Sequence, residues 1–304
     1  MEHEVARTRQ IRLGKYIHQL TVMGMLLPYL VGLTALVLVP SALALGLAFT
    51  RFDALTPPTW VGLANFVRMS NDRLFWLALS NTLLYLLLAV PLRIGGALLM
   101  ALLFKPQRPG ASLARAAIYL PAVIPDIAYA LIWLISFNPL YGPVNLLLGT
   151  LHLPTPAWTV EPWPALWALV LMATWQLGES FVILLASARG IPEELYAASA
   201  LDGANTWSHF RYITLPLLAP TLLLLTARDL IISLQANFVP SLIVTKGGPG
   251  NATLFIPLYT YWLAFDDLRF GYAAAVVWTL YLFTIVIVAG QALLVRRWQF
   301  LGEY

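Results

Sequence analysis

Long apolar runs separated by short polar connections dominate the hydropathy pattern of the chain. Each run is long enough to cross a hydrocarbon layer of roughly 30 Å, which takes about 20 helical residues. Continuous apolar character, rather than strict alternation, is typical of spanning helices and not of barrel strands. The pattern therefore predicts an all-α polytopic membrane protein with six transmembrane helices, at about Val22 to Phe49, Leu77 to Phe104, Ala116 to Phe137, Pro164 to Ala188, Leu217 to Ser241 and Tyr272 to Val295.

Lys and Arg are distributed unevenly between the two sides of these spans. They are more frequent in the N-terminal tail, the second and fourth connections and the C-terminal end than in the other connections. Because cytoplasmic loops hold the excess of positive charge, both termini and the fourth connection are expected in the cytoplasm. We expect a cytoplasmic tail at residues 1–21, one transmembrane domain at residues 22–295 and a second cytoplasmic tail at residues 296–304.

Composition agrees with this interpretation and excludes several other classes of protein. Hydrophobic residues make up 60% of the chain, charged residues 11%, and the mean hydropathy is +0.77. Cys is absent, and the four His are scattered over the tail and the loops, so we expect no metal site. The net charge of +4 is not arranged as a basic stripe with interleaved aromatics, so nucleic acid is not an expected partner.

The fourth connection begins with the signals of a short cytoplasmic helix. Pro192 suits a first helical turn, and Glu193 and Glu194 suit the positive end of the helix dipole. Apolar residues then recur every three positions on one face: Leu195, Ala198 and Leu201.

A turn and a second short helix follow. Gly203 offers a left-handed stop, and Asn205 or Thr206 can cap a helix expected to end before Pro216. On these signals alone, the segment could be an ordinary connector that packs on its own protein.

The segment "IPEELYAASALDGANTWSHFRYITLPLLAP" resembles the EAA loop of binding-protein-dependent ABC importer permeases. The positions that match the family pattern are Leu195, Tyr196, Ala198, Ser199, Asp202, Gly203, Ala204, Phe210, Ile213, Leu215 and Pro216. The resemblance implies that residues 190–216 form a coupling loop whose helix docks on a cytoplasmic ATPase subunit. The residues implied in that contact are Glu193, Glu194, Leu195, Tyr196, Ala197, Ala198, Ser199, Asp202, Gly203 and Ala204.

Ala197 departs from the family pattern, because the family usually has Glu at this position. A charged contact with the ATPase subunit is therefore in doubt. Glu193 or Glu194 could replace it only if the partner surface lies one helical turn away.

The resemblance extends from about Phe49 to the C-terminus and is closest to the carbohydrate branch, which includes maltose and glycerol-phosphate importers. It implies an inner-membrane subunit of a bacterium or archaeon that imports a sugar or polyol. The implied partners are a second permease, a cytoplasmic ATPase dimer that binds ATP and Mg²⁺, and an external solute-binding protein. This chain is expected to bind no cofactor. Gly247, Gly248 and Pro249 are implied in contact with the binding protein, although their turn propensity explains them equally well.

Candidate substrate-path residues lie on the fourth and fifth spans. A path for neutral polyols needs amides, hydroxyls and aromatic faces. Ser233 and Asn237 provide such groups at i and i+4, on one helical face. Interhelical hydrogen bonding is the alternative role for them. The full set of candidates is Trp175, Glu179, Ser233, Asn237 and Phe238.

Charged residues also fall inside the predicted spans, where a central charge costs about 2.5–3.5 kcal/mol. They are Arg93, Asp126, Glu179, Arg228 and Asp229. We expect structural pairing, for example of Arg93 with Asp126 and of Arg228 with a carboxylate. The alternative function is a proton-coupled secondary transporter that uses these carboxylates as carriers, against which the EAA-type loop argues.

Overall fold

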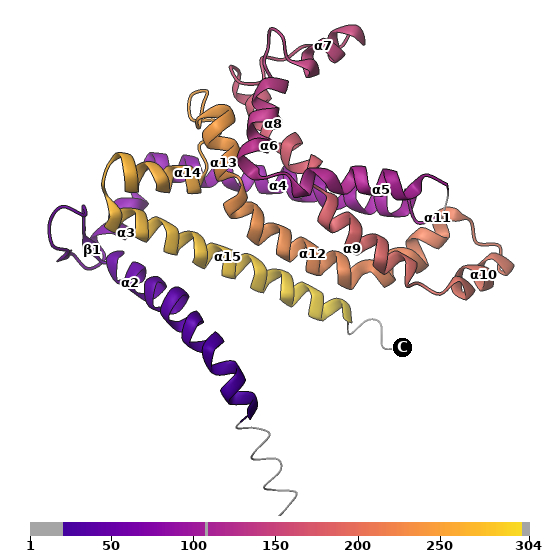
Figure 1. Ribbon diagram of the computed structural model, residues 1–304, viewed down its shortest axis with the longest axis horizontal. Helices are drawn as coiled ribbons and strands as arrows, with labels where there is room; N and C mark the ends of the chain where they lie inside the picture. The colour runs from indigo at the N-terminus through magenta and orange to yellow at the C-terminus, as the bar shows by residue number, and fades with distance from the viewer. Residues whose placement is uncertain (1–20, 107–108, 300–304) are drawn as a thin grey trace, which may run out of the picture.

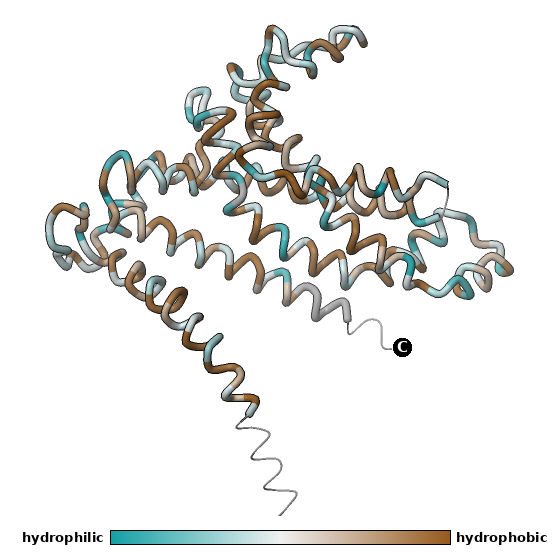
Figure 2. Tube along the Cα trace, in the orientation of Figure 1, coloured by the Kyte–Doolittle hydropathy of each residue, from teal (hydrophilic) through white to brown (hydrophobic). Residues whose placement is uncertain are grey.

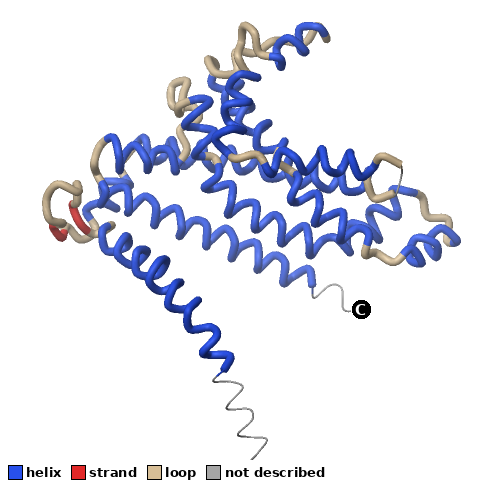
Figure 3. The backbone as a smooth tube through the Cα atoms, in the orientation of Figure 1, coloured by secondary structure: helices blue, strands red, loops and turns tan. Residues whose placement is uncertain are grey.

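The computed structural model describes residues 21–106 and 109–299, and these are helical almost throughout (Figures 1 and 3). The described residues include four helices that are long and apolar enough to cross a membrane by themselves. They are Thr21–Leu47, Arg73–Leu103, Thr206–Thr245 and Phe270–Leu293. The first ends as α2 (Val39–Leu47), the second is α4 (Arg73–Leu103), the third contains α12 (Leu215–Ala236), and the fourth belongs to α15 (Phe270–Gln299).

Two further apolar segments are bent helix pairs rather than the continuous spans that the hydropathy pattern predicts. The first joins α5 (Ala111–Tyr119) and the turn Leu120–Val123 to α6 (Asp126–Ser136) at 102°, and the second joins α8 (Pro162–Trp175) to α9 (Gly178–Arg189) at 43°. Pro121 and Pro125 explain the sharper bend, because proline lacks the N–H that would continue a helix. The described residues thus contain between four and six spans.

The helix before Pro216 does not end there, contrary to the sequence prediction. A turn of π-helix at Phe210–Thr214 connects α11 (Thr206–His209) to α12, so that one helical segment runs from Thr206 to Thr245. Pro216 lies in the first turn of α12. The wider π-helical turn directly before it alters the hydrogen-bond ladder, so the missing N–H is tolerated.

In Figure 1, α4, α5, α9, α12 and α15 run beside one another, whereas α6 and α8 project from this group. The segment that ends in α2 diverges from the bundle towards its N-terminus, although α2 itself still contacts α15. None of its apolar residues is buried, and Figure 2 shows the segment as strongly apolar. One end of the bundle carries α10 (Glu193–Leu201), and the opposite end carries β1 (Thr50–Arg51), β2 (Thr59–Trp60) and α3 (Ala64–Ser70). The remaining short helices are α7 (Pro143–Thr150), α13 (Phe238–Pro240) and α14 (Ile256–Tyr261).

The strands β1 and β2 are two residues each and pair antiparallel, with Thr50 opposite Trp60 and Arg51 opposite Thr59. Apart from this hairpin the predicted all-α class holds for the described residues. The largest buried cluster lies where α4, α8, α9 and α12 meet, and it combines Ala side chains with larger groups such as Leu169 and Phe181. Small residues let apolar helices approach closely, which is how membrane helices pack.

Asp72 joins three elements at the hairpin end of the bundle. It caps α4 by accepting hydrogen bonds from the backbone N–H of Leu74 and Phe75, and it also accepts from the hydroxyls of Tyr259 and Tyr272. Partial burial raises the pKa of Asp72, but the two hydroxyls and two backbone N–H groups outweigh burial and lower the pKa below its ordinary value. The ionised carboxylate therefore ties α4 to α14 and α15.

Asp72→Asn is expected to lower the thermal midpoint of the purified protein by a few degrees at neutral pH, because charge-assisted hydrogen bonds become neutral ones. The folded-state pKa of Asp72 is depressed, so its contribution is present above the unfolded-state pKa and is lost as the pH falls through the folded-state value. The stability difference between wild type and variant should shrink as the pH falls through that value. Asp53→Asn, at an exposed carboxylate bonded only within its own turn, is the matched control. An equal loss in both variants would contradict this role.

Candidate functional site

The helix and turn of the fourth connection form as the sequence predicts, with small shifts at the ends. Pro192 is the N-cap residue rather than the first helical residue, and α10 begins at Glu193. Gly203 has φ +81°, in the left-handed region. Asn205 caps α11 by accepting a hydrogen bond from the Ser208 backbone N–H at 2.9 Å. The predicted stop at Gly203 and the predicted cap at Asn205 are confirmed.

Tyr196 fastens α10 to the rest of the molecule. Its hydroxyl lies 2.9 Å from Oγ1 of Thr214, at the start of the long helix that contains α12. Its ring meets His209 edge to face, and Nζ of Lys105, just beyond the end of α4, lies 4.5 Å from the ring centroid. A displacement of α10 would therefore be transmitted to two different spanning helices.

The outward side of α10 is free of contacts within the described part of the chain. No residue of the helix is buried, and Leu201 is 91% exposed. The apolar positions Leu195, Ala198 and Leu201 face solvent, while Tyr196 and Ser199 face the protein. The other predicted coupling residues are also accessible: Glu193, Glu194, Ala197, Asp202 and Gly203 are exposed and Ala204 is half-buried. Apolar side chains held out in water on a fixed helix are typical of a surface that binds a partner.

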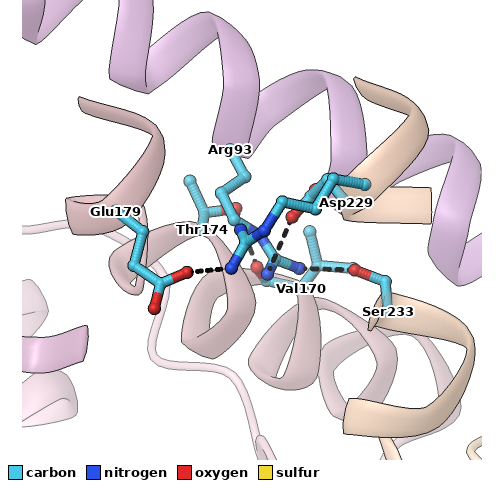
Figure 4. A network of polar contacts seen from close by, with 7 residues as sticks. Arg93, Val170, Thr174, Glu179, Asp229 and Ser233 are labelled. Carbon is cyan, nitrogen blue, oxygen red and sulfur yellow. Dashed lines mark hydrogen bonds and ion pairs between the residues drawn. The ribbon is translucent and has the colours of Figure 1, made fainter. Parts of the chain in front are cut away.

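A buried polar network lies between α4 and α12 (Figure 4). Arg93 forms an ion pair with Asp229 at 3.2 Å and donates a hydrogen bond to Oγ of Ser233 at 2.8 Å. Arg93 and Asp229 are 8% and 3% exposed. The predicted pairing of Arg93 with Asp126 is wrong, because the bend before α6 puts Asp126 at the exposed start of that helix.

A second ion pair joins Glu179, in the first turn of α9, to Arg228 on α12. The predicted pairing of Arg228 with a carboxylate is thus confirmed. The two side chains are 48% and 40% exposed, although both lie inside segments apolar enough to cross the membrane. Trp175 at the end of α8 is likewise exposed and meets Trp133 edge to face.

Asp229, Ser233 and Asn237 follow one another at intervals of four along one face of α12 and are all buried. Asn237 is 1% exposed, and neither its Oδ1 nor its Nδ2 has a hydrogen-bond partner within the described residues. An unpaired buried amide is costly, by about 1–3 kcal/mol. Phe238 follows directly, half-buried against the ring of Tyr261. The structure therefore joins Ser233 to α4 through Arg93 and leaves the buried amide of Asn237, directly after α12, unsatisfied.

The loop that contains Gly247, Gly248 and Pro249, the predicted contact with the binding protein, has a fixed shape. Gly247 has φ +76° and is buried, and a Cβ there would lie 3.1 Å from the Trp262 ring. Gly248 and Pro249 are half-exposed. The amide of Asn81 on α4 donates to the carbonyl oxygen of Asn251 at 2.8 Å. Gly247 thus shapes the loop, and the following two residues are the accessible ones.

The buried pair should behave as a unit. Arg93→Met leaves Asp229 buried without its partner and is expected to cost about 3–5 kcal/mol of folding free energy, whereas Arg93→Met combined with Asp229→Leu should recover most of it. The fraction of protein that stays monodisperse after heating in detergent measures the difference in stability between the single and the double variant. A double variant as unstable as Arg93→Met would refute the pairing.

Known transport proteins share the sequence and the fold of this chain. Residues 93–300 match the family of binding-protein-dependent transport system inner membrane components. A probable ABC transporter permease of Bacillus subtilis, YesP, is 35% identical over 83% of each chain, and the lactose transport system permease LacF of Rhizobium radiobacter is 34% identical over 74% of this chain and 78% of LacF. The crystal structure of a bacterial ABC transporter involved in the import of the acidic polysaccharide alginate contains a chain with a TM-score of 0.79 and 25% identity, covering 94% of this chain and 99% of that one. The chain is thus a multi-pass inner-membrane protein and belongs to the permease family of binding-protein-dependent ABC importers.

Proposed function

We propose that this chain is the permease subunit through which an ATP-driven importer moves a sugar or polyol delivered by an external binding protein. The observation that carries the proposal is α10, a helix with an exposed outward face that Tyr196 links to Lys105, just beyond α4, and to the α12 segment. The sugar class is supported by the names of relatives, which include lactose and trehalose/maltose transport permeases.

Six crossings result if each bent pair counts as one span. The α10 end then faces the cytoplasm, consistent with the Lys and Arg near Lys105, Arg115, Arg189 and Arg211. The hairpin and the loop at Gly248 face the external binding protein. On this division residues 22–295 are one permease domain, with cytoplasmic tails outside it.

The exposed ion pair between Glu179 and Arg228 supports a second permease subunit. Intramembrane charges face protein or a water-filled cavity rather than lipid, because hydrocarbon solvates them poorly. This pair is open to solvent in the single chain, so in the bilayer another subunit or an aqueous path has to cover it. We place the solute path beside Trp175, Glu179 and Arg228, at the border with the second permease.

The free energy of ATP hydrolysis would be coupled to transport through α10. An ATPase dimer that binds ATP and Mg²⁺ would bind the exposed face around Leu195 and Leu201, and closure of the dimer would displace the helix. Ala197 offers no charge for that contact, so the grip relies on shape and on the acidic residues at both ends of the helix, Glu193 and Asp202. This chain needs no cofactor of its own for that role.

The amide of Asn237, which has no hydrogen-bond partner within the described residues, supports a position for this residue on the solute path. It offers both a donor and an acceptor, which match sugar hydroxyls without presenting a charge. In the conformation described, the amide is buried at the end of α12. A solute could reach the amide only when the helices that surround it separate, as expected for a path that opens alternately to the two sides.

Gly203→Asp is expected to reduce ATP-driven uptake at least tenfold, while the subunit still inserts and co-purifies with its ATPase. Asp adds a negative charge to the docking surface at this left-handed position. Gly203→Asn is the matched control, because the Asn side chain has nearly the same shape as Asp, tolerates the left-handed conformation and carries no charge. Uptake of radiolabelled sugar and ATP hydrolysis in proteoliposomes are measured together. Normal coupling in Gly203→Asp would refute the role of the loop.

Asn237→Ala is expected to raise the sugar concentration needed for half-maximal uptake severalfold with no loss of thermal stability, because the amide makes no hydrogen bond within the described residues. Ser233→Ala should instead lower stability, because it removes the acceptor of an Arg93 hydrogen bond. Unchanged uptake kinetics in Asn237→Ala would exclude Asn237 from the path.

A further inference from the structure

A recess at the hairpin end of the bundle has features that the transport proposal does not use. It has a volume of about 490 Å³, within the range of ligand pockets. Its walls come from the hairpin, from α3 and from the residues around the start of α15. The charged residues that line it are Arg51, Asp53, Arg68, Asp267 and Arg269.

Positive charge in the recess is not neutralised by its own carboxylates. Arg269 pairs with Asp267 at 3.3 Å, and Oδ1 of Asp53 accepts from the backbone N–H groups of Leu55 and Thr56 in its own turn. The guanidinium of Arg51 makes no hydrogen bond or ion pair within the described residues. The guanidinium of Arg68 lies 4.9 Å from the Tyr272 ring centroid, a contact that leaves its N–H donors free. Two guanidinium groups are thus available to an anion.

The walls of the recess are rigid before any ligand arrives. The amide of Asn65 donates to the carbonyl oxygens of Ala48 and Thr50, which fixes α3 to the end of α2. A Cβ at Gly271 would lie 2.1 Å from the Thr50 carbonyl oxygen, so only glycine allows α15 to start this close to the hairpin. Preformed walls reduce the entropy lost on binding.

The recess lies at the level of the lipid headgroups. Arg51 follows the last residue of the first span, Leu47, by four positions, and Arg269 directly precedes α15. The headgroup layer occupies about 5–8 Å beyond each side of the hydrocarbon core, which is where residues so close to two span ends are found. Around the recess, Leu55, Trp60 and Leu63 are 79%, 72% and 64% exposed, a mixture of apolar and aromatic groups suited to the interface.

We propose that this recess binds the phosphate headgroup of an anionic phospholipid in the outer leaflet, with Arg51 and Arg68 as the phosphate ligands. Guanidinium groups match phosphate in geometry and charge. The exposed apolar helix that ends in α2 lies beside the recess and would accompany the acyl chains. The alternative anionic ligand, a single acidic side chain of the binding protein, would leave most of the volume of the recess empty.

The proposal is tested on the full chain, purified with the subunits that accompany it. Native mass spectrometry during titration with dioctanoylphosphatidylglycerol should show saturable binding that dioctanoylphosphatidylcholine does not reproduce. In Arg51→Gln combined with Arg68→Gln, the affinity for the anionic lipid should fall about 25-fold, because each arginine near a membrane surface contributes about a factor of five.

Three control variants separate lipid binding in the recess from lipid binding elsewhere on the protein. Arg73 is an exposed arginine at the same end of the bundle, but it does not line the recess. Arg73→Gln should therefore leave lipid binding unchanged. Arg51→Lys with Arg68→Lys should bind the anionic lipid more tightly than the Gln double variant and less tightly than the wild type, because the charge remains but the guanidinium geometry is lost. Arg51→Gln alone disturbs no side-chain contact and should still show a severalfold loss.

Three results would overturn the proposal. Equal binding of both lipids by the wild type would exclude headgroup recognition. Glycerol 1-phosphate binding as tightly as the lipid would identify a site for free anions. Loss of affinity for the binding protein in the Gln variants, with lipid binding intact, would identify a protein-docking surface.

Discussion

The cost of placing charge at bilayer depth constrains the whole arrangement of α4, α9 and α12. Arg93 can be buried there because Asp229 and Ser233 on the neighbouring helix meet it, which fixes the rotation of α12 about its axis. That rotation places Asn237 on the same buried face and Arg228 on the adjoining open one. One ion pair therefore helps to determine which side of α12 is buried and which side is open.

The two ion pairs also bear on proton-coupled transport. A proton carrier has to lose and regain its proton as the protein changes state. Both carboxylates that the structure places in a pair, Glu179 and Asp229, are engaged by arginine side chains of neighbouring helices. This arrangement favours a structural role for both, and family membership leads to the same conclusion.

Much of the fold was accessible from the sequence because the bilayer imposes a length and an apolar composition on each span. The helix signals at Gly203 and Asn205 were also local and were confirmed. What could not be predicted depends on partners distant in the chain. Asp229 rather than Asp126 pairs with Arg93 because a bend removes Asp126 from the bundle, and hydropathy does not detect bends. The substrate-path and binding-protein contacts remain predictions, since no contact within a single chain tests them.

The bend between α8 and α9 lies against the other interrupted span, at the end of α5. Gly178, the first residue of α9, packs so closely on the end of α5 that a Cβ would lie 2.8 Å from Cα of Tyr119. Because two backbones in such contact cannot slide independently, a displacement of α9 is expected to carry the end of α5 with it. The two interrupted spans are thus mechanically linked at this one glycine.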